Sequence, residues 1–130
     1  MAITAIRAVR NLLGNDVYFV RNQEQPNDTG GKGHALEVDA GAVVTCNMWI
    51  PWCRSQADFD WHHKIIMVPV GVNAIPVVFN IWQEGDYVRY SRDGLFPPDG
   101  DPVPGNCTAG GDRSVEIVGD DMFNADLRFF

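Results

Sequence analysis

Turn-forming residues interrupt this chain about every ten residues, and that spacing constrains its fold more than any other feature. Glycine, proline, asparagine and aspartate separate short runs that are rich in valine, isoleucine and aromatic residues. Runs of this kind at this spacing are typical of antiparallel all-β folds. The sequence therefore predicts one all-β domain over residues 1–130, an antiparallel β-sandwich, with a β-barrel or a β-trefoil-like fold as the alternatives.

The predicted strands cover most of the apolar runs, and they are residues 17–21, 35–38, 43–50, 62–68, 75–83, 86–91, 114–118 and 122–129. In the first dozen residues, apolar side chains at helical spacing compete with "TAIRAV", a run that suits a strand, and we favour the strand. The polar, glycine-rich stretches 22–34 and 92–112 are predicted to be loops. The second is long enough to suggest a functional loop.

Charge and hydropathy argue against several classes of protein. The chain has 17 acidic and 10 basic residues, a net charge of -7, and its basic residues are scattered. Binding to nucleic acid depends on clustered basic residues, so we do not expect nucleic acid as a partner. We find no secretory signal and no apolar run long enough to cross a membrane. We therefore expect a soluble protein that is cytoplasmic or released without a signal peptide.

The stretch "CNMWIPWC" at 46–53 holds two of the three cysteines and two of the four tryptophans. Successive side chains of a strand point to opposite faces, which predicts a core face and an outer face for 43–50. The core face consists of Val44, Cys46, Met48 and Ile50. The outer face consists of Val43, Thr45, Asn47 and Trp49.

Pro51 is expected to end this strand, so that Trp52 and Cys53 belong to the turn that follows it. Extended chain would hold Cys46 and Cys53 too far apart for a disulfide, unless the chain reverses sharply at Pro51. All three cysteines are therefore expected to be free thiols. We predict that Cys46 is buried and slow to react, and that Cys53 and Cys107 react sooner.

A β-hairpin is predicted in "VFNIWQEGDYVRYS", with its turn at Glu84–Gly85. A two-residue turn there would pair Phe79 with Tyr90 and Ile81 with Val88 on an inner apolar face, whereas a three-residue turn with a glycine bulge would shift this register. The outer face would then carry Asn80, Trp82, Tyr87 and Arg89, with Trp82 opposite Tyr87.

Exposed aromatic rings beside asparagine and arginine are typical of carbohydrate sites, because the ring covers the C–H face of a sugar and the polar groups bind its hydroxyls. The predicted ligand-binding residues are Asn47, Trp49, Asn80, Trp82, Tyr87 and Arg89. The competing interpretation is that a second sheet or a long loop covers these rings, which would make them part of the core.

Metal sites are weaker predictions. Asp93, Asp99 and Asp101 offer oxygen ligands for calcium in the 92–112 loop, but the spacing of an EF-hand and its closing glutamate are missing. Asp60 and His62 would share a face of a strand beginning near residue 58, with His34 as a distant third ligand. We expect no cofactor, and calcium is the alternative.

The chain contains no hydrolase signature, and acidic residues alone do not make a catalytic pair, so we do not expect an enzyme. The leading prediction is a lectin-like module that binds a carbohydrate or glycoconjugate. One alternative is a lipid- or membrane-binding cytolysin or toxin component whose tryptophans insert at the headgroups. The other is a structural module whose outer aromatics form a homo-oligomer.

In size, acidity and β pattern the chain resembles the small cytoplasmic lectins of fungi and bacteria and the aegerolysin-type membrane binders. It shares no motif with either group, so no residue role is carried over from them.

Overall fold

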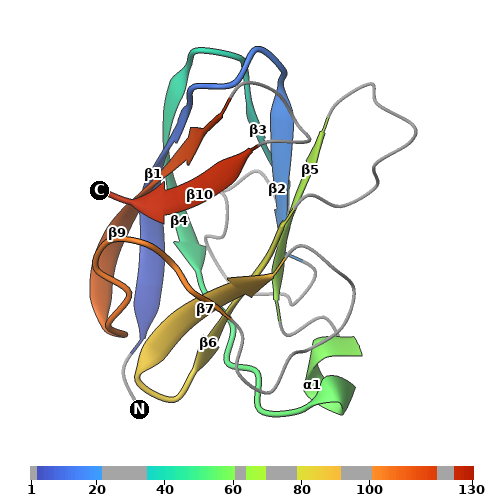
Figure 1. Cartoon of the computed structure of the whole chain (residues 1–130), viewed down its shortest axis with the longest axis vertical. Helices are drawn as coiled ribbons and strands as arrows, with labels where there is room; N and C mark the ends of the chain where they lie inside the picture. Colours follow the sequence, from blue (N-terminus) through green and yellow to red (C-terminus); the bar gives the residue numbers. More distant parts are fainter. Residues whose placement is uncertain (1–2, 22–34, 61–63, 70–78, 92–100, 120–124) are drawn as a thin grey trace.

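The computed structural model describes residues 3–21, 35–60, 64–69, 79–91, 101–119 and 125–130. These residues form two β-sheets and one short helix (Figure 1). The strand order is β10-β9-β1-β4 in the four-stranded sheet and β3-β2-β5-β6-β7-β8 in the six-stranded sheet. The prediction of an all-β sandwich is confirmed, and the described strands close no barrel.

The four-stranded sheet consists of β1 (Thr4–Asn11), β4 (Val43–Trp49), β9 (Gly111–Val118) and β10 (Asp126–Phe129). The six-stranded sheet consists of β2 (Val17–Arg21), β3 (Ala35–Val38), β5 (Ile65–Pro69), β6 (Phe79–Glu84), β7 (Tyr87–Ser91) and β8 (Asp101–Pro102). Each predicted strand has a counterpart, and the first dozen residues contain a strand rather than a helix. The 92–112 stretch, predicted to be a loop, contains β8 and the start of β9.

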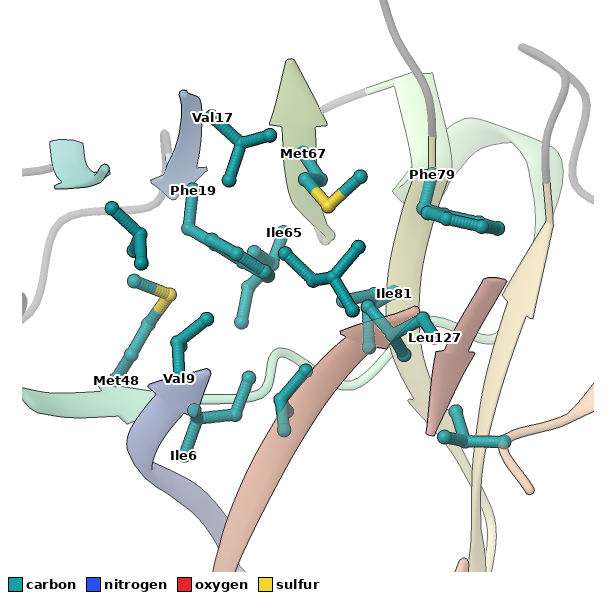
Figure 2. Close-up of a cluster of buried hydrophobic side chains, with 14 of the residues drawn as sticks. Ile6, Val9, Val17, Phe19, Met48, Ile65, Met67, Phe79, Ile81 and Leu127 are labelled. Atoms are coloured by element: carbon teal, nitrogen blue, oxygen red, sulfur yellow. The ribbon is translucent and has the colours of Figure 1, made fainter. Parts of the chain in front are cut away.

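The hydrophobic core lies between the inner faces of the two sheets, and both sheets contribute to it. Figure 2 shows Phe19, Ile65 and Ile81 from the six-stranded sheet beside Leu127 from the four-stranded sheet. On β4 the predicted alternation is confirmed. Met48, together with Ile50 just after the strand, is buried, and the other two residues of the predicted core face are half-buried against the same core.

Among the described residues, hydrogen bonds that join the sheets include two between side chains. The Thr4 hydroxyl of β1 donates to the Gln83 side-chain oxygen of β6, at 2.9 Å, and both residues are buried. The Tyr90 hydroxyl of β7 donates to Asp126 Oδ1 of β10, also at 2.9 Å. Because buried polar groups are costly unless paired, these bonds favour one alignment of the two layers.

A β-bulge interrupts the alternation of β1 at Arg7. Ile6 pairs with Met48 and Ala8 pairs with Thr45, so two residues of β4 lie opposite one residue of β1. The bulge puts both Arg7 and Ala8 on the outer side of the sheet, while Ile6 before it and the next residue after Ala8 point into the core.

The β6–β7 hairpin forms, but in a different register from the predicted one. Its turn residues are Gly85 and Asp86, which pair Trp82 with Arg89 instead of Tyr87 and move the other predicted pairs by two residues. Gly85 has a φ of 60°, a conformation that two-residue hairpin turns require. A shift of two residues keeps every side chain on its predicted face.

The structure also corrects the interpretation of 58–64 as the start of a strand. Residues Gln56–Asp60 form a helix, α1, and β5 begins only at Ile65. Ser55 caps this helix, since its hydroxyl accepts the Asp58 backbone N–H at 3.2 Å. The Asp58 carboxylate in turn accepts the backbone N–H of Arg54 at 3.1 Å.

Candidate functional site

The six predicted ligand-binding residues fall on two separate surfaces. Asn47 and Trp49 lie on β4 of the four-stranded sheet, and the other four lie on β6 and β7 of the six-stranded sheet. The outer faces of a two-layer sandwich point away from each other, so the two groups cannot contact one small ligand together.

Trp82 is fully buried, so the prediction that its ring is exposed is wrong. The chain after β4 continues along the end of β6. The Cys53 N–H donates to the Gln83 carbonyl at 3.0 Å, and the Gln83 N–H donates to the Pro51 carbonyl at 2.8 Å. Cys53 and Trp82 then form a second buried cluster. Asn80, on the same face, is buried as well.

The cysteines are free, as predicted, but their burial differs from the expectation. Cys53 is fully buried rather than in an accessible turn, whereas Cys46 is half-buried and its thiol donates to the Ile6 carbonyl at 3.3 Å. Burial raises the pKa of each of these two thiols to about 11. Both are therefore weak nucleophiles near neutral pH.

The accessible part of the β6–β7 outer face includes the exposed Tyr87 and the half-buried Arg89 and Glu84, and we call these three residues the Tyr87 surface. Tyr87 is 47% exposed, and the Arg89 guanidinium carbon lies 5.8 Å from the centre of its ring. Arg89 Nε lies 3.6 Å from Glu84 Oε2, and Glu84 Oε1 accepts the Trp82 indole N–H at 3.4 Å. The surface thus combines an exposed ring, a cation and an anion on one pair of strands.

Glu84 is a member of this surface that the sequence interpretation did not identify. The correct hairpin register would have identified Glu84, because a turn at Gly85–Asp86 pairs Glu84 with Tyr87 directly. The prediction placed Glu84 in the turn itself and so removed it from the strand face.

On the four-stranded sheet, Trp49 is 36% exposed. The side-chain oxygen of Asn47 is buried beside the β1–β4 bulge, with no hydrogen-bond partner among the residues that the structure describes. The Asn47 oxygen is therefore enclosed, and Trp49 is the exposed member of this pair.

Three carboxylates of the β2–β3 region come together at the surface. Those of Asp16, Glu37 and Asp39 have oxygens within 4.8 Å of one another, and Asp16 Oδ1 also accepts the Ala40 N–H at 2.8 Å. Carboxylate oxygens are ligands that calcium prefers. Two of the three residues are exposed, and such clusters are common without a metal, so the cluster alone assigns no ion.

Most of the predicted metal ligands lie outside the described residues, namely His34, His62, Asp93 and Asp99. Asp101, the remaining calcium candidate, is exposed on the two-residue strand β8. Asp60 ends α1 rather than lying on a strand beside residue 62, which removes the geometric reason for pairing those two residues.

No family model, no curated protein and no solved structure matches this chain. Within the part of the chain that the structure describes, none of the helical segments has the length and apolar character needed to cross a membrane.

Proposed function

We propose that this protein is a carbohydrate-binding module and that the Tyr87 surface is its binding site. The observation that carries the proposal is the exposed Tyr87 ring with Arg89 and Glu84 beside it. An aromatic ring covers the apolar face of a sugar, while a guanidinium donates hydrogen bonds to its hydroxyls and a carboxylate accepts them. These three side chains supply all three kinds of contact within one hairpin.

The buried residues beneath this surface take a different part in the proposal. Trp82 does not stack on the ligand, because its ring is enclosed, but its indole N–H bonds to Glu84. Such a bond holds the carboxylate in one orientation before a ligand arrives, which lowers the entropic cost of binding. Trp82 is thus a positioning residue, buried Asn80 makes no contact with the ligand, and Tyr87, Arg89 and Glu84 make the contacts.

A glycan array followed by titration calorimetry with the best free sugar tests the proposal. Tyr87→Ala is expected to weaken binding at least tenfold, or by about 1.4 kcal/mol, because the stacking ring is lost. Arg89→Lys keeps the charge but loses the planar fork, so we expect a smaller loss. Both variants should keep the thermal stability of the wild-type protein.

Trp49→Ala is the matched control, since it removes an exposed ring from the opposite sheet. Unchanged sugar affinity in this control supports the assignment. If Trp49→Ala abolished sugar binding and Tyr87→Ala did not, the site would lie on the four-stranded sheet and the proposal would fail. Pelleting with lipid vesicles that no free sugar inhibits would favour the lipid-binding alternative instead.

A further inference from the structure

The outer face of the four-stranded sheet carries most of the exposed large hydrophobic side chains. Among the described residues seven such side chains are exposed, and five of them belong to this sheet or to the residues next to its strands. These five are Ile3, Leu12, Val43, Trp49 and Phe130. Large exposed hydrophobic side chains gathered on one face often mark an interface.

Strand alternation places all five on the same side. In β1 and the residues that flank it, Ile3 precedes buried Thr4, and Leu12 follows buried Asn11. Because the β1 bulge keeps both Arg7 and the next residue on the outer side, Ile3 and Leu12 share a face although they lie nine positions apart. On β4, residues 43 and 49 are both outward positions. The Phe130 ring lies over the outward guanidinium of Arg10, 4.4 Å from the ring centre.

The charges on this outer face nearly balance. Arg7 pairs with Asp112 at 2.9 Å, and buried Glu116 pairs with both Arg10, at 2.8 Å, and Arg128. Asp126 at the start of β10 bonds to Tyr90 of the other sheet, so the outward ionisable residues of the four strands are three arginines and two acids, and 3 − 2 gives a net charge of +1. The whole chain has a net charge of -7, so its negative charge lies elsewhere.

Several outward positions of this sheet carry small side chains. Ala5, Ala8, Thr45 and Ser114 occupy neighbouring outward positions on β1, β4 and β9, and the register pairs Ala8 with both Thr45 and Ser114. Short side chains allow another sheet to approach closely, and sheets packed face to face lie about 10 Å apart.

The area suits a weak specific contact. The four strands have 8, 7, 8 and 4 residues, and these 27 residues, at about 3.4 Å along a strand and about 4.8 Å across it, cover roughly 440 Å². Two such faces bury about 900 Å² in total, close to the lower limit of about 1,000 Å² for specific interfaces between proteins.

We propose that two copies of this chain associate through the outer faces of their four-stranded sheets. The charge of this face favours a second copy of the chain as the partner. Two copies of an acidic protein repel each other over most of their surfaces, and a nearly neutral face is where they can meet at the lowest electrostatic cost. An anionic membrane would instead require a cluster of unpaired basic residues, whereas the arginines of this face are paired with Asp112 or Glu116. The interface does not depend on carbohydrate binding, since the Tyr87 surface is on the other layer.

Sedimentation velocity of the wild-type protein between about 1 and 100 µM tests the proposal, because a dimer with a micromolar Kd would form across this range. The sedimenting mass should rise towards twice that of a single chain. Val43→Glu and Trp49→Glu each place a pair of like charges in the interface and should return the protein to a monomer at all concentrations. Trp52→Glu is the matched control, since Trp52 is 37% exposed against 36% for Trp49 but lies beside β6.

A second measurement covers the case in which a glutamate variant fails to fold. In a Cys107→Ala background, which removes the most accessible native thiol, Ala8→Cys places a thiol near the middle of the outer face, and a short bismaleimide should join two such chains, whereas Thr108→Cys on the other sheet should not be joined. A monomeric wild-type protein at 100 µM, or equal cross-linking of the two cysteine variants, would overturn the proposal. It would also be overturned if Trp52→Glu dissociated the dimer and Trp49→Glu did not, or if monomers bound vesicles through Trp49.

Discussion

Gly105 lies against the backbone of Phe129, with a φ of 96°, and a Cβ added there would come within 2.5 Å of the Phe129 carbonyl oxygen. Gly105→Ala should therefore cost about 2–5 kcal/mol, the sum of a left-handed backbone penalty and a steric one. Urea unfolding measures this cost. Gly41→Ala is the control, because Gly41 has a φ of 77° but open space around it, and we expect about 1 kcal/mol there. An equal loss of unfolding free energy in the two variants would mean that the Phe129 backbone moves to accommodate the new methyl group.

Thiol reactivity depends on burial at each cysteine rather than on the kind of element that carries it. The pKa of the Cys53 thiol and that of the Cys46 thiol are both about 11. Cys107 lies half-buried in the segment before β9. At pH 8 we expect maleimide to modify Cys107 first and Cys53 last, which reverses the order predicted from sequence for Cys53. Peptide mapping by mass spectrometry after timed labelling checks the order, and fast native modification of Cys53 would contradict its burial.

The same two thiols predict a loss of stability at high pH. Their pKa is 9.0 when unperturbed and about 11 in the folded protein, so the folded state binds the two protons more tightly. This contribution is fully present below pH 9 and is lost as the pH rises through 11. Melting temperatures should therefore fall over this interval, and the fall should be smaller in a Cys46→Ala, Cys53→Ala double variant.

At the scale of single elements, β6 is the strand whose two faces are both covered. Phe79 and Ile81 point into the main core, and Trp82 points into the cluster with Cys53. We expect Phe79→Ala and Trp82→Ala each to cost about 3–5 kcal/mol, because both leave large cavities. Trp49→Ala should cost about 1 kcal/mol or less, since its ring is exposed. Denaturant unfolding of the three variants separates these values, and a low cost for Trp82→Ala would mean that its cover opens readily.

The sequence predicted the strands well because alternation and turn residues are local signals. It assigned the faces of β4 and of the β6–β7 hairpin correctly, even where the register was off by two residues. It could not predict the burial of Trp82, because the cover comes from Pro51–Cys53, about 30 positions earlier in the chain, and depends on where that segment goes after β4. Helix α1 was not predicted, although Ser55 and Asp58 have the spacing that is typical of capping residues at a helix N-terminus.

Glu116 ties three strands of the four-stranded sheet together, since β1 and β10 each supply one arginine to its carboxylate on β9. The hydrogen bond from Arg128, followed by that from Arg10, lowers the pKa of this carboxyl below its usual 4.5. The stability from these ion pairs is therefore present above pH 4.5 and lost as the pH falls through the lowered value. Glu116→Gln should lower the melting temperature at pH 7, and the difference from wild type should shrink towards pH 3. A difference that is the same at both pH values would mean that the charge of Glu116 does not matter.

At the scale of the whole molecule, the two proposed surfaces lie on opposite layers of the sandwich. The Tyr87 surface is on the outer side of the six-stranded sheet, and the proposed dimer contact is on the outer side of the four-stranded sheet (Figure 1). Contact between two four-stranded sheets would leave both Tyr87 surfaces free and facing away from each other. If both proposals hold, the dimer therefore has two sugar sites, one on each chain. These sites cannot reach the same ligand molecule, but they can bridge two ligand molecules.

Bridging gives a result that neither surface produces alone. The wild-type dimer should precipitate a polyvalent glycoconjugate bearing the preferred sugar, because each dimer links two particles and repeated links add avidity. Val43→Glu should abolish precipitation while leaving the affinity for the free sugar unchanged, since each monomer keeps its site. Tyr87→Ala should abolish both precipitation and sugar binding while remaining a dimer. Turbidity, calorimetry and sedimentation, measured on the same three proteins, distinguish these outcomes. Precipitation by a monomeric Val43→Glu protein would show that one chain carries more than one sugar site. The protein would then be bivalent without the proposed dimer.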